Sequence, residues 1–123
     1  MKTYSQMKKG ENGMPQWDEL YSVIMFFAEG RHTWIKTDLY QQVADAIHMP
    51  DELRYANYTQ GDKAGTNVIE DITSYAVSTL RGFRLIGPMD NWADSDTCYI
   101  TDHGKKMFEK YGSKLNQETV MML

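Results

Sequence analysis

Apolar side chains recur at α-helical spacing in three segments of the chain. In residues 17–28 they fall at i, i+3, i+4, i+7, i+10 and i+11, which makes one continuous stripe on a predicted helix. Two later segments show the same spacing, with inward residues Leu39, Val43 and Ile47, then Ile69, Ile72, Ala76 and Leu80. Three apolar stripes are removed from water when the three helices pack with these faces against one another, so the pattern predicts a helical core.

Residues at the ends of these segments support the same helices. Pro15 and Thr37 precede the first and second stripes, and Asn67 precedes the third with Glu70 three positions later, as in a capping box. The predicted ends are Gly30, Pro50 and Gly82. Residues 51–55 are predicted to form one further turn, and residues 57–65 a polar loop.

Two short β-branched or aromatic runs follow the third helix. Residues 84–86 and 97–100 flank a turn-rich connector, which predicts a hairpin with a long tip. Thr101 is then a predicted N-cap for a fourth helix that ends at Gly112, and residues 33–35 are a candidate short strand. Three helices followed by a hairpin is the winged-helix plan, so we expect an α+β, mainly α, winged helix-turn-helix fold with a C-terminal helix.

The 123 residues predict one domain. Residues 1–14 lack periodicity and are expected to be a flexible arm, residues 15–112 the winged-helix domain, and residues 113–123 a tail. The apolar end of that tail predicts a homodimer. No apolar run approaches the roughly 20 residues of a membrane span, and the N-terminus lacks a signal-peptide pattern, so a cytoplasmic location without membrane contact is expected.

The charge is unevenly distributed. Residues 15–100 carry six basic side chains against thirteen acidic ones, a net of −7 within a total of −4. Phosphate binding depends on lysine and arginine, so this acidic body argues against strong non-specific DNA binding.

Several short motifs resemble a known family. Residues 14–20 read MPQWDEL, residues 39–44 read LYQQVA, Tyr75–Ala76 and Leu80 follow, and residues 99–104 read YITDHG. In this order the motifs resemble the N-terminal domain of Mrr-type restriction proteins, across about residues 14–112. The resemblance implies a winged helix that engages DNA and that, in the family, precedes a nuclease domain.

Candidate nucleic-acid contacts lie on and after the third helix. Outward positions able to hydrogen-bond bases or phosphates are Asn67, Thr73, Ser74 and Ser78, and Arg81 and Arg84 follow where they could touch the DNA backbone. The alternative for these residues is a solvated helix face whose arginines pair with nearby carboxylates.

A second hypothesis is an acidic protein-interaction module. Positions where the family carries an Asn-Arg pair read Asp71 and Ile72, and the hairpin connector carries Asp90, Trp92, Asp94 and Asp96. Tryptophan is a frequent interface anchor, so the partner on this reading is a restriction component or another DNA-handling protein.

No catalytic constellation is found. None of the lysines follows an acidic residue by two positions, so the PD-(D/E)xK nuclease motif is absent. His32, His48 and His103 lack the spacing of zinc ligands, and Cys98 is expected to be a buried apolar side chain. No glycine-rich nucleotide motif occurs either, so neither a cofactor nor an enzyme is predicted.

Overall fold

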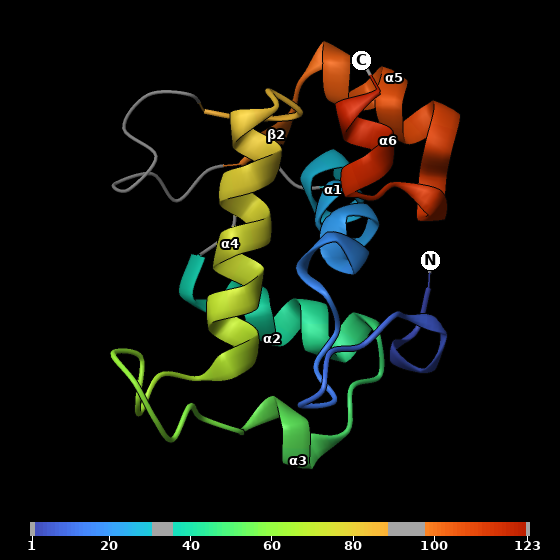
Figure 1. The fold of residues 1–123 in the computed structure, drawn as a ribbon. Coiled ribbons are helices and arrows are strands. Elements are labelled where there is room, and N and C mark those ends of the chain that lie inside the picture. The colour runs from blue at the N-terminus through green and yellow to red at the C-terminus, as the bar shows by residue number, and fades with distance from the viewer. Residues whose placement is uncertain (1, 31–35, 89–97, 123) are drawn as a thin grey trace.

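A computed structural model describes residues 2–30, 36–88 and 98–122 of the chain (Figure 1). Within these ranges the structure is mainly helical with one small antiparallel sheet, as the α+β prediction requires. The elements are η1 (Tyr4–Gln6), η2 (Trp17–Leu20), α1 (Tyr21–Gly30), α2 (Lys36–Ala46), α3 (Asp51–Arg54), α4 (Val68–Gly82), β1 (Ile86–Gly87), β2 (Tyr99–Ile100), α5 (Asp102–Tyr111), η4 (Gly112–Lys114) and α6 (Gln117–Met121).

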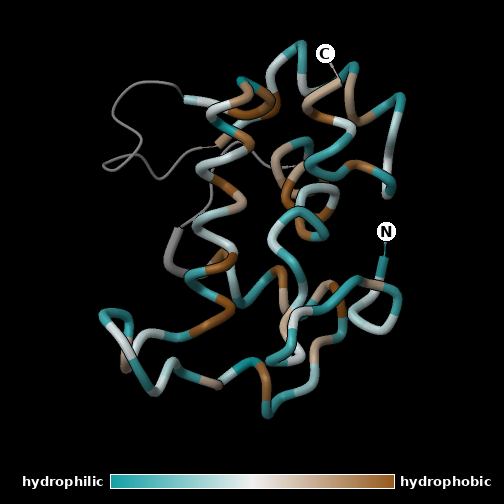
Figure 2. The backbone as a smooth tube through the Cα atoms, in the orientation of Figure 1, coloured by the Kyte–Doolittle hydropathy of each residue, from teal (hydrophilic) through white to brown (hydrophobic). Residues whose placement is uncertain are grey.

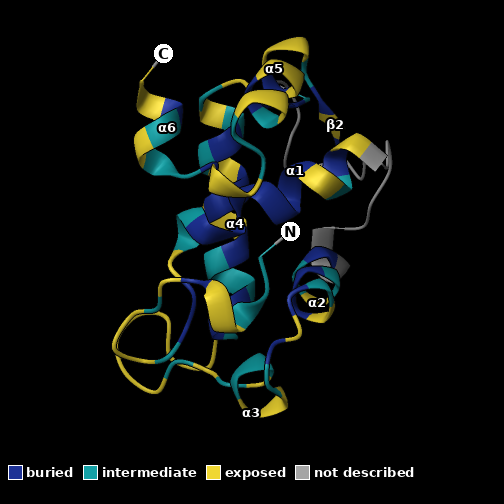
Figure 3. Ribbon diagram, turned by 90° about the vertical axis from the view of Figure 1, so that its right-hand side faces the viewer, coloured by how far each residue is buried: buried dark blue, intermediate teal, exposed yellow. Residues whose placement is uncertain are grey.

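The core lies where α1, α2 and α4 meet. Most residues of the predicted stripes are buried: Leu39 and Val43 on α2, Ile47 just after it, and Ile69, Ala76 and Leu80 on α4. Ile72, also predicted to face inward, is half-buried at the edge of the core. The first predicted helix begins as the 3-10 turn η2 and continues as α1. Buried residues follow the inner faces of these helices (Figure 3), and hydrophobic and hydrophilic positions alternate along α4 (Figure 2). Helical periodicity therefore predicts most of the buried positions on these helices.

Two of the predicted helix caps are present. The Asn67 side chain accepts a hydrogen bond from the Glu70 N–H at 2.9 Å and starts α4. The Thr101 hydroxyl accepts one from the Gly104 N–H at 2.9 Å and starts α5. These bonds satisfy amide groups that a helix N-terminus leaves without partners. At the other end of α5, Gly112 has a φ of +51°, which favours glycine.

The two strands after α4 pair in the predicted antiparallel sense. Ile86 lies opposite Ile100, and Gly87 lies opposite Tyr99. The backbone then joins α5 to the sheet, because the Thr101 N–H donates to the Leu85 carbonyl at 3.1 Å. Most of the predicted connector, including Asp90, Trp92, Asp94 and Asp96, and the candidate strand at residues 33–35 lie outside the described residues.

The N-terminal segment differs from the expectation of a loose arm. Met7 and Met14 are buried in the core, and the Tyr4 N–H donates to the Ile47 carbonyl at 2.8 Å. Lys9 and Pro15 form an isolated antiparallel bridge. Single apolar anchors without a repeating helix or strand leave no periodicity to detect, which is why composition alone suggested an arm.

The C-terminal residues also pack on the body. Leu115 and Val120 are buried, whereas Met121 and Met122 are 65% and 70% exposed. The Gln117 N–H donates to the Asp18 carboxylate at 3.1 Å, which fastens α6 to η2. Part of the apolar tail is therefore covered by this same chain.

No helix among residues 2–30, 36–88 and 98–122 has both the length and the apolar character of a membrane span.

Candidate functional site

The residues predicted to contact nucleic acid do not form one surface. Ser74 and Ser78 are exposed on α4, as predicted. Thr73 is only 3% exposed, so the prediction that it faces outward is wrong. Residues 69, 73, 76 and 80 follow the helical repeat as closely as 69, 72, 76 and 80. The fold turns position 73 into the core and leaves Ile72 at its edge.

The remaining candidates have other positions. The Asn67 amide caps α4 and also donates to the Arg54 carbonyl at 2.9 Å, so it is engaged within the fold. Arg81 is half-buried in the last turn of α4. Arg84 is exposed and lines a separate pocket with His103 and Met121. Arg84 therefore lines a different pocket from Ser74 and Ser78, and Arg81 is too buried to join them in one exposed surface.

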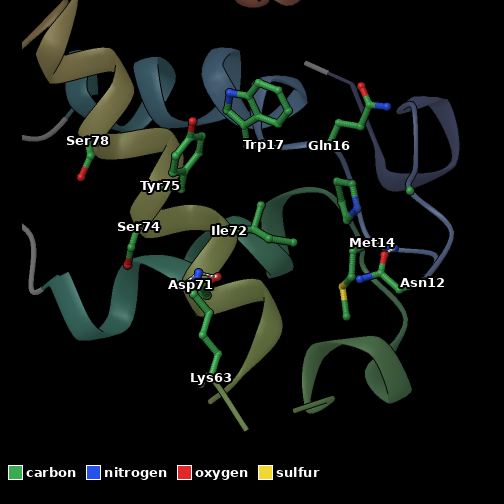
Figure 4. A pocket seen from close by; sticks show the side chains of 12 residues that line it. Asn12, Met14, Gln16, Trp17, Lys63, Asp71, Ile72, Ser74, Tyr75 and Ser78 are labelled. Atoms are coloured by element: carbon green, nitrogen blue, oxygen red, sulfur yellow. Dashed lines mark hydrogen bonds and ion pairs between the residues drawn. The ribbon is translucent and has the colours of Figure 1, made fainter. Parts of the chain in front are cut away.

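A larger pocket lies between α4 and residues 10–17, with a volume of about 520 Å³ (Figure 4). Its size is in the range of ligand pockets. We call it the α4 pocket, and it is lined by Gly10, Asn12, Met14, Pro15, Gln16, Trp17, Lys63, Asp71, Ile72, Ser74, Tyr75 and Ser78. The exposed serines are thus part of a hollow whose other wall is the N-terminal segment.

One end of the α4 pocket is aromatic. The rings of Trp17 and Tyr75 meet edge to face, with centroids 5.7 Å apart and planes at 83°, an arrangement that aromatic pairs favour. Trp17 is held from behind: its Nε1–H donates to the Tyr21 hydroxyl at 3.1 Å, and that hydroxyl donates to Gln117 Oε1 at 2.6 Å. The chain of hydrogen bonds connects the pocket wall to α6 and fixes the indole orientation.

The other end of the α4 pocket carries an ion pair. Lys63 Nζ lies 3.0 Å and 3.3 Å from the two carboxylate oxygens of Asp71, and the Tyr58 hydroxyl donates to the same carboxylate at 3.0 Å. The hydrogen bond to Asp71 raises the pKa of Lys63. The pKa of Tyr58 is raised by burial and then by Asp71. The lysine of the pocket is therefore charged and already paired.

The single thiol of the chain lies outside the lining of this pocket. Cys98 is buried, as predicted, and burial raises the pKa of its thiol to about 12, so the thiol stays protonated at neutral pH. Within the part of the chain that the structure describes, no three His, Cys, Asp or Glu side chains gather as metal ligands would. The walls of the α4 pocket are apolar and aromatic, with a few polar groups.

Sequence reasoning missed the contribution of Met14, Trp17 and Tyr75 to this pocket. The sequence predicts Met14 within the arm and Trp17 within a stripe that faces the core, and it places Tyr75 alongside the inward residues of the third helix. One feature of the sequence does indicate the pocket: Ile72 and Tyr75 widen the apolar stripe of the third helix to one side, beyond the face that packs on the core.

Tyr21 provides a test of the support behind Trp17. Tyr21→Phe removes the hydroxyl that accepts from Trp17 and donates to Gln117, leaving two polar groups without their partner. We expect the free energy of unfolding to fall by about 1–2 kcal/mol at neutral pH in urea titrations. An unchanged unfolding midpoint would show that the hydrogen bonds add nothing to stability.

The same side chain predicts a loss of stability at alkaline pH. Burial raises the pKa of Tyr21 from 10.0 to about 12, so between these values the folded state holds a proton that the unfolded state has lost. This contribution to stability is complete below pH 10 and disappears as the pH rises toward 12. Urea titrations across that range should show a shallower alkaline decline for Tyr21→Phe than for the wild type, and equal slopes would contradict the assignment.

No protein-family model, no curated protein and no solved structure matches this chain.

Proposed function

We propose that this chain is a non-catalytic winged-helix module that recognises a partner protein through the α4 pocket. The order of α1, α2 and α4 followed by the β1–β2 pair supports the winged-helix assignment, with α4 in the place of the recognition helix. The resemblance of the sequence motifs to the N-terminal domain of Mrr-type restriction proteins supports the same assignment. On this proposal the partner is a restriction component or another DNA-handling protein.

The observation that carries the proposal is the electrostatic character of the α4 face. A recognition helix needs cations at its N-terminal end to approach phosphates, but the first turn of α4 carries Glu70 and Asp71. The lysine on this face, Lys63, is neutralised by Asp71 at 3.0 Å. Bringing DNA phosphates to this end of the helix would therefore meet carboxylate repulsion with little compensating attraction.

The apolar character of the same face favours protein. Tyr75 is 58% exposed although it is aromatic, and Ile72 is half-buried at the edge of the core beside it. Energetic hot spots of protein interfaces are enriched in tryptophan and tyrosine that sit in or beside such hollows. Trp17 and Tyr75 supply both residue types in one rigid pair.

Affinity capture of the intact chain tests this proposal. Nuclease-treated extract of the cells that naturally produce the chain is passed over the wild type, Ile72→Glu and Tyr55→Ala. We expect a protein that the wild type and Tyr55→Ala retain and that Ile72→Glu loses by at least about tenfold, since the variant places a charge in the pocket. Tyr55 is 71% exposed and outside the α4 pocket, so it is the matched control. Capture that is equal in all three proteins would contradict the proposal, and circular dichroism verifies that Ile72→Glu is folded.

Nucleic-acid binding remains the second candidate, because Ser74 and Ser78 are exposed on α4 and Arg84 is exposed just beyond it. A fluorescence titration with labelled duplex DNA at several salt concentrations distinguishes the two. If the pocket binds protein, we expect no saturable DNA binding at low salt up to roughly 10 µM chain, a concentration within the range of non-specific affinities. The double variant Arg81→Ala, Arg84→Ala should then give the same titration curve as the wild type. Tight binding that weakens steeply with salt and is abolished by the double variant would establish the nucleic-acid function instead.

A further inference from the structure

The surroundings of the α4 pocket identify the chemistry of its occupant. At or directly beside its lining residues, the sequence places five carboxylates and two lysines, a net of −3; they are Glu11, Asp18, Asp62, Glu70 and Asp71, and Lys9 and Lys63. Such an excess of negative charge around an apolar hollow attracts a cationic partner as it approaches and helps to fix its orientation once it is bound.

Both lysines are already committed within the protein. Lys63 pairs with Asp71, as described above. Lys9 Nζ lies 4.6 Å from the ring centroid of Tyr4 and donates to the Met7 carbonyl at 2.8 Å. Among the described residues, by contrast, neither Glu11 nor Asp62 has an ion pair, and both are exposed. The Asp18 carboxylate accepts from the Gln117 N–H, so Glu11 and Asp62 are the carboxylates beside the lining residues whose negative charge is least compensated.

The floor of the α4 pocket sets a second requirement. Met14 and Pro15 are buried beneath it and Ile72 forms its middle, so a purely polar cation would leave apolar surface in contact with water. At the aromatic end, the Tyr75 hydroxyl has no hydrogen-bond partner among residues 2–30, 36–88 and 98–122, so it can bond to a backbone carbonyl of an incoming segment.

Resting on the proposed function, we propose that the α4 pocket binds a segment of a basic partner protein, in which a side chain of leucine or aromatic size is flanked by lysine or arginine. The apolar side chain occupies the hollow over Ile72, and the flanking cation lies at the Asp71 end. There it competes with Lys63 for the same carboxylate, so the internal ion pair acts against binding.

This competition predicts opposite effects for the two members of one ion pair. Lys63→Ala frees Asp71 and removes a repelling charge, so a basic segment should bind about fivefold more tightly. Asp71→Asn removes the attracting charge at nearly constant shape, so the same segment should bind about fivefold more weakly. A merely structural role for the pair would move the two variants in the same direction.

The experiment uses the intact chain and two fluorescein-labelled synthetic peptides. Both carry leucine at helical spacing, one with lysine and the other with glutamate at the remaining positions. Fluorescence anisotropy is recorded for the wild type, Lys63→Ala, Asp71→Asn and Tyr75→Ala, and a labelled DNA duplex is the third probe. We expect binding of the lysine peptide only, tightened by Lys63→Ala and weakened by Asp71→Asn and Tyr75→Ala.

The possible failures are distinguishable. Preference for the glutamate peptide, or binding of the lysine peptide that none of the variants changes, would overturn the basic-segment proposal. Absence of binding to either peptide, while pocket-dependent capture from extract persists, would also overturn it and would leave the proposed function standing. Saturable binding of the DNA duplex with loss of that capture would overturn both.

Discussion

Gly104→Ala is expected to lower the free energy of unfolding by about 3 kcal/mol. Gly104 lies in the first turn of α5 directly against the Leu85 carbonyl, and a Cβ at this position would overlap that backbone oxygen. The oxygen cannot retreat easily, because the Thr101 N–H donates to it at 3.1 Å. The Thr101 hydroxyl donates to the neighbouring Arg84 carbonyl at 2.6 Å and also lies 3.1 Å from the Leu85 oxygen, so both carbonyls are held at the start of α5. Relieving the overlap would separate α5 from the segment that leads into β1.

Gly82→Ala is the matched control for this prediction. Gly82 is the last residue of α4, and an added Cβ would meet no atom within 4 Å. Alanine is favoured over glycine in helices, so we expect unchanged stability or a gain of up to about 1 kcal/mol. Urea unfolding of the wild type and the two variants measures the difference. Equal midpoints for Gly104→Ala and Gly82→Ala would show that the close approach of α5 to Leu85 does not exist in solution.

Met14→Asp is the second variant with a large expected effect, a loss of about 3 kcal/mol or more. Met14 is 3% exposed and belongs to the hydrophobic core, so the substitution would bury a carboxylate without a cationic partner in the surrounding core. The same change at an exposed methionine, Met122→Asp, should alter stability by no more than about 0.5 kcal/mol.

This comparison decides how the first fourteen residues behave. A segment that packs through Met7 and Met14 makes the domain sensitive to Met14→Asp in thermal or urea unfolding. If residues 1–14 were a loose arm, Met14→Asp and Met122→Asp would unfold at the same denaturant concentration. In that case the wall of the α4 pocket formed by residues 10–17 would be lost as well.

Local signals in the sequence were enough to predict most of the secondary structure. The spacing of Leu39, Val43 and Ile47 predicts the buried face of α2, and the side chains of Asn67 and Thr101 cap the helices that they were expected to start. These features depend on residues within one or two turns of each other. Their physical cause is therefore contained in short stretches of sequence.

Local signals failed where the repeat of the helix was ambiguous or absent. Positions 72 and 73 fit the apolar stripe of α4 equally well, and only packing against its neighbours turned Thr73 inward. Met7 and Met14 lie in a segment without any repeat, so nothing nearby in the sequence indicates their burial. Tertiary contacts decide both cases.

The candidate site was predictable only in part. The exposure of Ser74 and Ser78 on α4 follows from periodicity. The α4 pocket, however, depends on Trp17 meeting Tyr75 and on the hydrogen bonds that join Trp17 to Tyr21 and Gln117. Trp17, Tyr75 and Gln117 are far apart in the chain, and their convergence follows from how η2, α4 and α6 are placed around the core (Figure 1).

Site-specific photo-crosslinking tests the central claim most directly, by placing p-benzoyl-phenylalanine at position 75 or, as the control, at position 55, in the cells that naturally produce the chain. Both tyrosines are exposed, but only Tyr75 lines the α4 pocket. Recognition of a protein through this pocket predicts a discrete protein adduct at position 75 that is absent at position 55. Adducts to nucleic acid at position 75, or the same adducts at both positions, would contradict it.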